Sequence, residues 1–163
     1  CFKGQTLQQK LLTMFEQQMF GSGPVIMYVQ VGIWDACFGG GDVKQFGRDL
    51  HSFLQAMMTN TPYIHLSLAT AMHNSLPQHQ KRYNSTIVER SYTYNEEVKQ
   101  VAQSLHLPVL DTPYKVTRRM AKQCLDGVHY DPKTNNRLGH VAMNQLCYDQ
   151  RLMADSSSNS EYT

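Results

Sequence analysis

The stretch Val25-Ile26-Met27-Tyr28-Val29-Gln30-Val31-Gly32 decides the fold class of this chain. It is a β-rich and nearly continuous apolar run, preceded by Gly21-Ser22-Gly23-Pro24 and followed by a Gly-rich loop at residues 39–41. Such a run is typical of a strand that is buried on both faces of a parallel sheet. The sequence therefore predicts a buried parallel strand over residues 25–32.

The segments around this strand alternate between helical and strand patterns. Apolar residues at three- and four-residue spacing predict helices, and short β-rich runs predict two further strands. The predicted helices cover residues 7–20, 43–58, 87–105, 114–124 and 136–153, and the further strands cover residues 63–70 and 108–111. Asp42 is expected to cap the second of these helices, and Asn135 or Asn136 the last one. This alternation is typical of an α/β domain whose parallel sheet carries helices on its faces.

Length and composition fit one globular domain. The chain has 163 residues, of which 41% are hydrophobic and 17% are charged, so disordered, collagen-like and coiled-coil classes are excluded. We expect one domain with a compact core over residues 1–153, and a disordered tail rich in serine and acidic residues over 154–163. Three strands alone make a narrow sheet, which suggests that a first strand is absent from this sequence.

Charge and hydropathy exclude two classes of partner. A formal net charge of +2 gives no electrostatic footprint for duplex nucleic acid or an anionic membrane. The basic pairs Lys81-Arg82 and Arg118-Arg119 are typical of solvated surface, so no nucleic-acid partner is predicted. The longest apolar run is far shorter than the roughly 20 residues that span a bilayer, so no membrane span is expected. A protein partner remains open.

The cysteines and the first residue bear on redox state and compartment. The four cysteines are Cys1, Cys37, Cys124 and Cys147. They are too few and too scattered for a disulfide scaffold, and no C-x-x-C pair suggests zinc, so no metal or cofactor is predicted. The chain begins with Cys rather than Met, which indicates a processing site or a truncation. No leader pattern is visible, which favours an intracellular location, and the triplet Asn84-Ser85-Thr86 matters for glycosylation only in the secretory route.

The polar turn Asp126-Gly127-Val128-His129-Tyr130-Asp131-Pro132 places an acid three residues from an imidazole. A histidine that acts as a general base needs a partner that fixes its tautomer, and Asp126 can do this for His129. Two other interpretations stay open. Asp126 can be a helix cap beside an exposed His129, or Asp126, His129 and Asp131 can bind a metal, although the sequence shows no further ligand.

A second candidate segment follows the first strand. Ligands of parallel α/β sheets bind outside the carboxyl ends of the strands. In this sequence the segments at those ends begin at Gly32, Thr70 and Thr112. The first reads Gly32-Ile33-Trp34-Asp35, where a backbone N–H or the indole N–H can point at an oxyanion. The alternative is that Trp34 covers the edge of the core and that Asp35 starts a turn.

Taken together, these motifs resemble a known family. The residues that carry the resemblance are Gly32-Ile33-Trp34-Asp35, Ala69-Thr70-Ala71-Met72, the helix from Glu96 to Leu105, Val109-Leu110-Asp111 and Asp126-Gly127-Val128-His129-Tyr130-Asp131. In this order, over roughly residues 25–147, the chain resembles the PC-esterase domain family of SGNH (GDSL-type) hydrolases. The resemblance implies a flavodoxin-like α/β/α sandwich and a Ser-His-Asp triad that acts on O-acyl esters.

The resemblance also implies roles for individual residues. His129 looks like the general base and Asp126 like the acid that orients it. Gly32 to Asp35 occupies the family's third motif block, in which many SGNH enzymes read G-x-N-D and the asparagine donates to the oxyanion. Trp34 stands at this position, so Gly32, Trp34 and Asp35 form a candidate oxyanion and substrate region that lacks the amide donor.

The family's nucleophile motif is not found. No G-D-S occurs in the sequence, where Gly41-Asp42-Val43 departs from it at the third position. Ser22 would lie at the wrong edge of the sheet, and Ser67 is expected to be packed inside a strand. Cys37 and Ser75 follow strand ends at the right edge and stay open as alternative nucleophiles.

Two classes of function remain. The first is a serine esterase of the PC-esterase type, for which this chain holds the acid and the base but not the serine. The second is a catalytically inactive module of the same fold, which binds a partner or serves as a scaffold. If a first strand is missing, apolar surface is expected to be exposed where it would pair.

Overall fold

The computed structural model describes residues 25–38, 41–61, 64–71, 86–120 and 129–158. Within these residues, three parallel strands form one sheet in the order β1-β2-β3. The strands are β1 (Val25–Gln30), β2 (Ile64–Ala69) and β3 (Val109–Leu110). Each strand lies where the sequence predicts one, and the predicted α/β class with a parallel sheet is confirmed. The predicted helix over residues 7–20 and the tail end at 159–163 lie outside the described residues.

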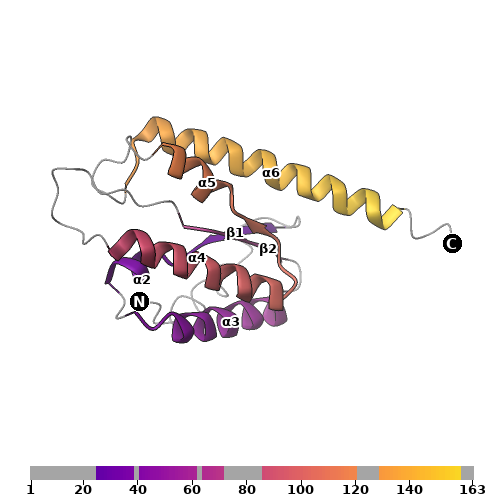
Figure 1. Ribbon diagram of the computed structural model, residues 1–163. Coiled ribbons are helices and arrows are strands. Elements are labelled where there is room, and N and C mark those ends of the chain that lie inside the picture. Colours follow the sequence, from indigo (N-terminus) through magenta and orange to yellow (C-terminus); the bar gives the residue numbers. More distant parts are fainter. Residues whose placement is uncertain (1–24, 39–40, 62–63, 72–85, 121–128, 159–163) are drawn as a thin grey trace.

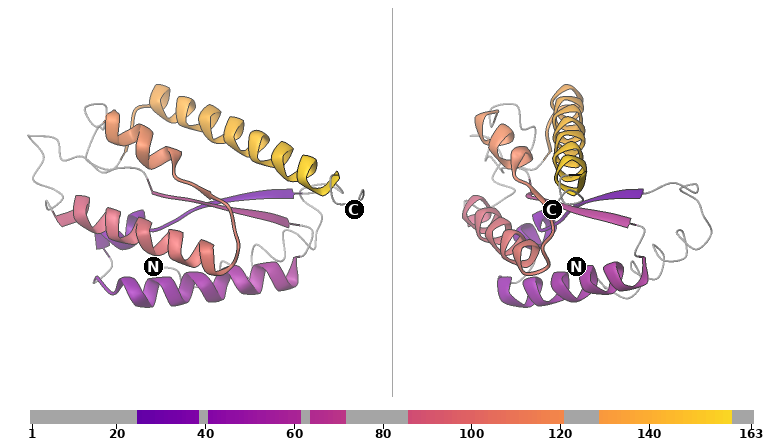
Figure 2. Two further views of the ribbon diagram at one scale, coloured as in Figure 1. Left: turned by 45° about the vertical axis from the view of Figure 1, so that its right-hand side comes forward. Right: turned by 90° about the vertical axis from the view of Figure 1, so that its right-hand side faces the viewer.

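Helices cover both faces of this sheet, as Figures 1 and 2 show. The helices are α2 (Ile33–Phe38), α3 (Val43–Asn60), α4 (Thr86–Ser104), α5 (Thr112–Arg119) and α6 (Pro132–Ser158). The helices α3 and α4 lie on one side of the sheet, and α5 and α6 lie on the other (Figure 1). This arrangement is the predicted α/β/α sandwich. No helix in the described part of the chain is both long enough and apolar enough to cross a membrane.

The sequence prediction missed α2 and placed the start of α5 too late. A six-residue helix is shorter than two turns, so it shows no periodic apolar pattern. The helix α5 begins at Thr112 rather than at Tyr114, because Asp111 stands at the N-cap and Pro113 falls in the first turn. Proline fits there because the first N–H groups of a helix have no intrahelical partner.

The last helix also begins earlier than predicted. The expected caps were Asn135 or Asn136, whereas α6 begins at Pro132 and Asp131 holds the cap position. Several cap-forming residues follow one another here, and proline at the first helical position favours the earliest of them. The helix continues to Ser158, into the segment for which the sequence predicts a tail.

The helix α3 packs on the sheet as its periodicity predicts. The Asp42 carboxylate accepts a hydrogen bond of 2.8 Å from the Gln45 N–H, which confirms the predicted cap. The buried apolar residues of α3 are Phe46, Leu50, Phe53, Leu54 and Met57. Burying one such side chain contributes about 1.5–3 kcal/mol relative to leaving it in water. This stripe is therefore a main source of stability in the domain.

One face of the sheet carries most of the core. Side chains alternate along a strand, so Val29 and Val31 point to the same side, and Leu66 and Leu68 on β2 join them. All four are buried in one apolar cluster with residues of α3 and α4. The core therefore lies between the sheet and these two helices.

The sequence predicts that β1 is buried on both faces. This prediction is wrong for the face that points away from α3 and α4. Ile26 is 41% exposed, its register partner His65 is exposed, and Tyr28 is partly buried. On the same face, Ala69 and Leu110 are fully buried toward β3. Since β1 stands first in the strand order, it lies at one edge of this sheet. The residues that cover the middle of the sheet on this face do not extend over the outer side chains of β1. Exposed apolar surface thus lies on β1.

We expect Leu54→Ala to lower the free energy of unfolding by about 2–5 kcal/mol, because it leaves a cavity under a fully buried side chain. The measurement is urea denaturation followed by circular dichroism. Met58→Ala is the matched control, since Met58 lies on the same helix but is 39% exposed. An equal loss in both variants would show that the α3 face is not packed as described.

Candidate functional site

The carboxyl ends of the three strands meet at one edge of the sheet. The register pairs Gln30 with Ala69, and Ala69 with Leu110. A side-chain bond strengthens this edge, since Gln30 Nε2 donates to the carbonyl of Thr70 at 3.0 Å. The segments in which the sequence predicts ligand chemistry therefore lie close together in space.

Gly32 turns the chain from β1 into α2. Its φ of +99° lies in the region that favours glycine, and its carbonyl accepts the first helical hydrogen bond from the Ala36 N–H at 2.9 Å. A Cβ at this position would lie 3.5 Å from the Tyr94 Cβ, which is an ordinary contact. The dihedral angle, rather than lack of space, therefore requires glycine. The turn places Trp34 in the first turn of α2, at the end of the sheet where β1 finishes (Figure 1).

Trp34, the single tryptophan of the chain, contacts the imidazole of His129. The two ring centroids lie 6.1 Å apart, and the ring planes are tilted by 55°. The indole is 47% exposed and His129 is exposed, so solvent reaches both side chains. The structure thus brings together Trp34 and His129, which lie far apart in the sequence.

The residues after His129 hold this histidine in place. Tyr130 is buried, and its phenol donates to the carbonyl of Thr117 in α5 at 3.2 Å. The side-chain amide of Asn135 in α6 donates to the Tyr130 carbonyl at 3.1 Å. His129 therefore stands on a backbone that is tied to both α5 and α6.

The other predicted site residues are only partly accounted for. Asp126 lies outside the described residues, so its contact with His129 stays a prediction. Asp35 is partly buried on α2. Burial raises the pKa of the Tyr94 phenol, and the negative charge of Asp35 adds to this shift. The effect of Asp35 on Tyr94 is therefore electrostatic.

Both carboxylate oxygens of Asp131 serve the N-terminus of α6. The Thr134 N–H donates to Oδ1 at 2.9 Å, and the Thr134 hydroxyl donates to Oδ2 at 3.0 Å. The hydrogen bond from the Thr134 backbone, followed by that from its hydroxyl, lowers the pKa of the Asp131 carboxyl. The cap accounts for Asp131 without a metal. Within the described ranges, no three His, Cys, Asp or Glu side chains gather to hold a metal ion.

We expect Asp131→Asn to weaken the protein more at about pH 6 than at about pH 3. A carboxylate whose pKa is lowered by folding stabilises the native state above its unfolded pKa, and this contribution is lost as the pH falls through the folded value. The measurement is the difference in melting temperature between the two proteins at each pH. Asp49→Asn, on the exposed face of α3, removes a carboxylate that caps no helix. A difference of equal size at both pH values would contradict the cap.

A buried asparagine that the sequence analysis missed fixes the segment after β2. Asn95 in α4 is 1% exposed. Its Oδ1 accepts from the Ala71 N–H at 2.7 Å, and its Nδ2 donates to the Ala71 carbonyl at 3.2 Å. The available signal was a polar residue on the helix face that also carries Tyr94 and Val98, since buried amides are almost always hydrogen-bonded. Asn95 thus holds the backbone at the carboxyl edge as a neighbouring strand would.

Replacing this amide tests its role. We expect Asn95→Ala to lower the free energy of unfolding by about 2–5 kcal/mol, because the buried N–H and carbonyl of Ala71 lose their partners. The measurement is urea denaturation. Asn60→Ala is the matched control, since the exposed Asn60 amide bonds only the Ala56 carbonyl near the end of α3. A small effect in Asn95→Ala would mean that Ala71 finds other partners.

The residues that the sequence analysis considered as nucleophiles, of which Cys37 and Ser75 stayed open, fall into three groups. Ser67 is 2% exposed inside β2, as expected of a packed strand residue. Cys37 lies on α2, one turn after Trp34, and is partly buried. Ser22 and Ser75 lie outside the described residues. Cys37 is therefore the one alternative whose position at the carboxyl edge can be seen.

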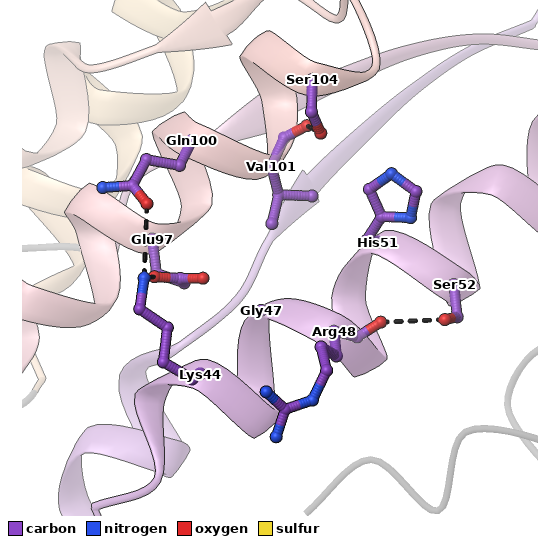
Figure 3. Close-up of a pocket in the computed structure, with 9 residues that line it drawn as sticks. All are labelled: Lys44, Gly47, Arg48, His51, Ser52, Glu97, Gln100, Val101 and Ser104. Atoms are coloured by element: carbon purple, nitrogen blue, oxygen red, sulfur yellow. Dashed lines mark hydrogen bonds and ion pairs between the residues drawn. The ribbon is translucent and has the colours of Figure 1, made fainter.

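A groove of about 480 Å³ lies between α3 and α4, and no predicted site residue lines it. Lys44 reaches across it from α3, with its Nζ 2.8 Å from Glu97 Oε2 on α4 (Figure 3). Gly47 makes room for this carboxylate, because a Cβ at position 47 would overlap the Glu97 side chain. Lys44, Glu97 and Gln100 thus join the two helices across this groove.

Comparisons with known proteins place the fold. No family model and no curated protein matches the sequence. The structure is similar to a lipase/acylhydrolase from Enterococcus faecalis, with a TM-score of 0.59 and 16% identity over 85% of this chain and 69% of the other. It is similar to a catalytic mutant of an acetylxylan esterase from Geobacillus stearothermophilus, with a TM-score of 0.58 and 15% identity over 84% and 66%. For the acetyl xylan esterase AlAXEase the TM-score is 0.57 and the identity 15%, over 85% and 75%. The chain therefore has the fold of the SGNH hydrolases.

Proposed function

We propose that this chain carries the acid and the base of an acyl-ester hydrolase of the PC-esterase type, with His129 as general base and Asp126 as the acid that orients it. The observation that carries the proposal is the contact between His129 and Trp34. The contact supports the proposal because it joins one residue from each of two motifs of the family resemblance, at the edge where α/β sheets bind their ligands. The similarity in fold to a lipase/acylhydrolase and to acetylxylan esterases supports ester hydrolysis as the reaction class.

In this mechanism His129 moves the protons. A serine hydroxyl attacks the acyl carbonyl while His129 takes its proton, and Asp126 stabilises the resulting imidazolium. The imidazolium then protonates the leaving alkoxide, the alcohol departs, and an acyl-enzyme remains. Water attacks the acyl-enzyme as His129 takes its proton, and the carboxylic acid leaves when His129 returns that proton to the serine.

The serine of this mechanism is not assigned to a residue of the printed sequence. Gly41-Asp42-Val43 lacks the serine of the family's first motif, and Ser67 is packed inside β2. The proposal therefore gives this chain the acid and the base alone. Its test uses the longest polypeptide encoded by the reading frame that contains these residues.

The second candidate is a catalytically inactive binding or scaffold module. The hydrogen bonds of the turn at His129 support it. In this case the turn at His129 has a structural task, because the bonds of Tyr130 and Asp131 join it to α5 and α6. A folded full-length polypeptide that hydrolyses no ester would select this candidate.

We expect His129→Ala to lower the rate of p-nitrophenyl acetate hydrolysis by about 100- to 10,000-fold, because a positioned general base contributes this much. The imidazole is exposed to solvent, so the melting temperature should change little. The measurement is the initial rate at neutral pH together with the melting temperature.

The matched control is His51→Ala, because His51 lies on α3 in the α3–α4 groove. This variant should keep the wild-type rate. An unchanged rate in His129→Ala would remove His129 from the mechanism. An equal loss in both variants would mean that the effect is not specific to the carboxyl edge of the sheet.

A further inference from the structure

We propose that the groove between α3 and α4 binds a small organic phosphate, and that Arg48 and His51 hold its phosphate group. None of the residues predicted for ester hydrolysis lines this groove. This binding site therefore goes beyond the proposed function and does not rest on it.

The groove has the size of a small-molecule site. Its volume of about 480 Å³ lies within the range of ligand pockets, which is roughly 300–1,000 Å³. Val101 points from α4 toward α3 (Figure 3), and both Val101 and Gly47 are buried. These two residues form an apolar floor between polar walls. A bare phosphate ion would leave much of this space unfilled, so we expect the ligand to carry an organic group as well.

The wall that α3 contributes is basic. Lys44, Arg48 and His51 are four and three residues apart, so they lie on one face of the helix. The acidic residue of the lining is Glu97, whose Oε2 lies 2.8 Å from the Lys44 Nζ. This ion pair balances one positive charge with one negative charge. The guanidinium of Arg48, which is always protonated, therefore leaves the groove with a net positive charge.

Arg48 and His51 have donor groups that a ligand can use. Arg48 is exposed, and its Nη2 donates to Gln45 Oε1 at 2.8 Å, which leaves further N–H groups of the guanidinium. The His51 imidazole lies on the side of α3 that faces Val101 and Ser104 (Figure 3). Within the described ranges, His51 forms no hydrogen bond or ion pair. The two basic side chains are one helical turn apart, so one anion can contact both.

A phosphate monoester matches these groups better than a carboxylate or a metal cation does. It carries a charge of about −1.5 to −2 at neutral pH and three acceptor oxygens, so it can pair with Arg48 and a protonated His51 together. A carboxylate has a single charge, which Arg48 alone balances. In the described part of the chain, no three His, Cys, Asp or Glu side chains gather to hold a cation. Gln100 adds a neutral donor, because its Oε1 accepts from Lys44 and its amide N–H groups remain.

Calorimetric titration of the full-length polypeptide with phenyl phosphate tests this site. Benzoate and benzyl alcohol, which carry the same ring with a carboxylate or with no charge, are titrated in parallel at the same pH and ionic strength. We expect saturable binding of phenyl phosphate, binding of benzoate that is at least about fivefold weaker, and no binding of benzyl alcohol. No binding of phenyl phosphate, or equally tight binding of benzoate, would overturn the proposal.

Variants locate the binding in the groove. We expect Arg48→Gln to weaken phenyl phosphate binding about 10- to 100-fold, because a hydrogen bond between charged groups is lost. His51→Ala should weaken it about three- to tenfold. Arg119→Gln is the matched control, because it removes the same charge from an exposed residue of α5, on the other side of the sheet. Wild-type affinity in a folded Arg48→Gln variant, or an equal loss in Arg119→Gln, would refute the site.

Two further measurements keep the test independent of folding and of ester hydrolysis. Arg48 is exposed on α3, so the melting temperature of Arg48→Gln should stay close to that of the wild type. If this variant does not fold, His51→Ala carries the test, and wild-type affinity in it would refute the site. The variant His129→Ala should bind phenyl phosphate as the wild type does, whether or not the wild type hydrolyses an ester. Failure of the esterase proposal and failure of the phosphate site are therefore seen separately.

Discussion

The parallel pairing of β1 with β2 is the constraint on which the rest of this structure depends. Parallel strands run in the same chain direction, so the two carboxyl ends stop at the same edge and each connection must cross back over a face. The register from Val25–Ile64 to Gln30–Ala69 therefore sets both the helix layer and the place where the chain turns outward. That edge determines where the chain turns at Gly32, where the segment at Ala71 lies and where a histidine contacts Trp34.

Much of this fold could be predicted from local patterns, because apolar periodicity reports burial directly. The strand at 25–30 and the buried stripe of α3 are examples. The short helix α2 escaped prediction, since six residues hold too little periodicity. The exposure of Ile26 could not be predicted either. The residues of a strand do not show which other helices or strands cover each of its two faces.

The candidate site, like the fold, could be predicted from the sequence only in part. His129 and Trp34 could be singled out from the sequence because their chemistry and position after predicted elements are local properties. Their contact could not be predicted, since it joins two residues that lie far apart in the sequence. Asn95 escaped for a related reason: its partner, the Ala71 backbone, lies on another element. The sequence does not show which backbone groups the side-chain amide of a helical residue will hydrogen-bond.

Because glycine has no side chain, Gly47 limits how the sequence of this protein can change during evolution. The Glu97 carboxylate occupies the space that a Cβ at position 47 would need, and the same carboxylate forms the ion pair with Lys44. A larger residue at 47 would push α3 away from α4 or expel the carboxylate, leaving the lysine without its partner. Among relatives of this chain, the residues at positions 44, 47 and 97 should therefore change together. Glycine is expected at 47 wherever an acidic residue is kept at 97.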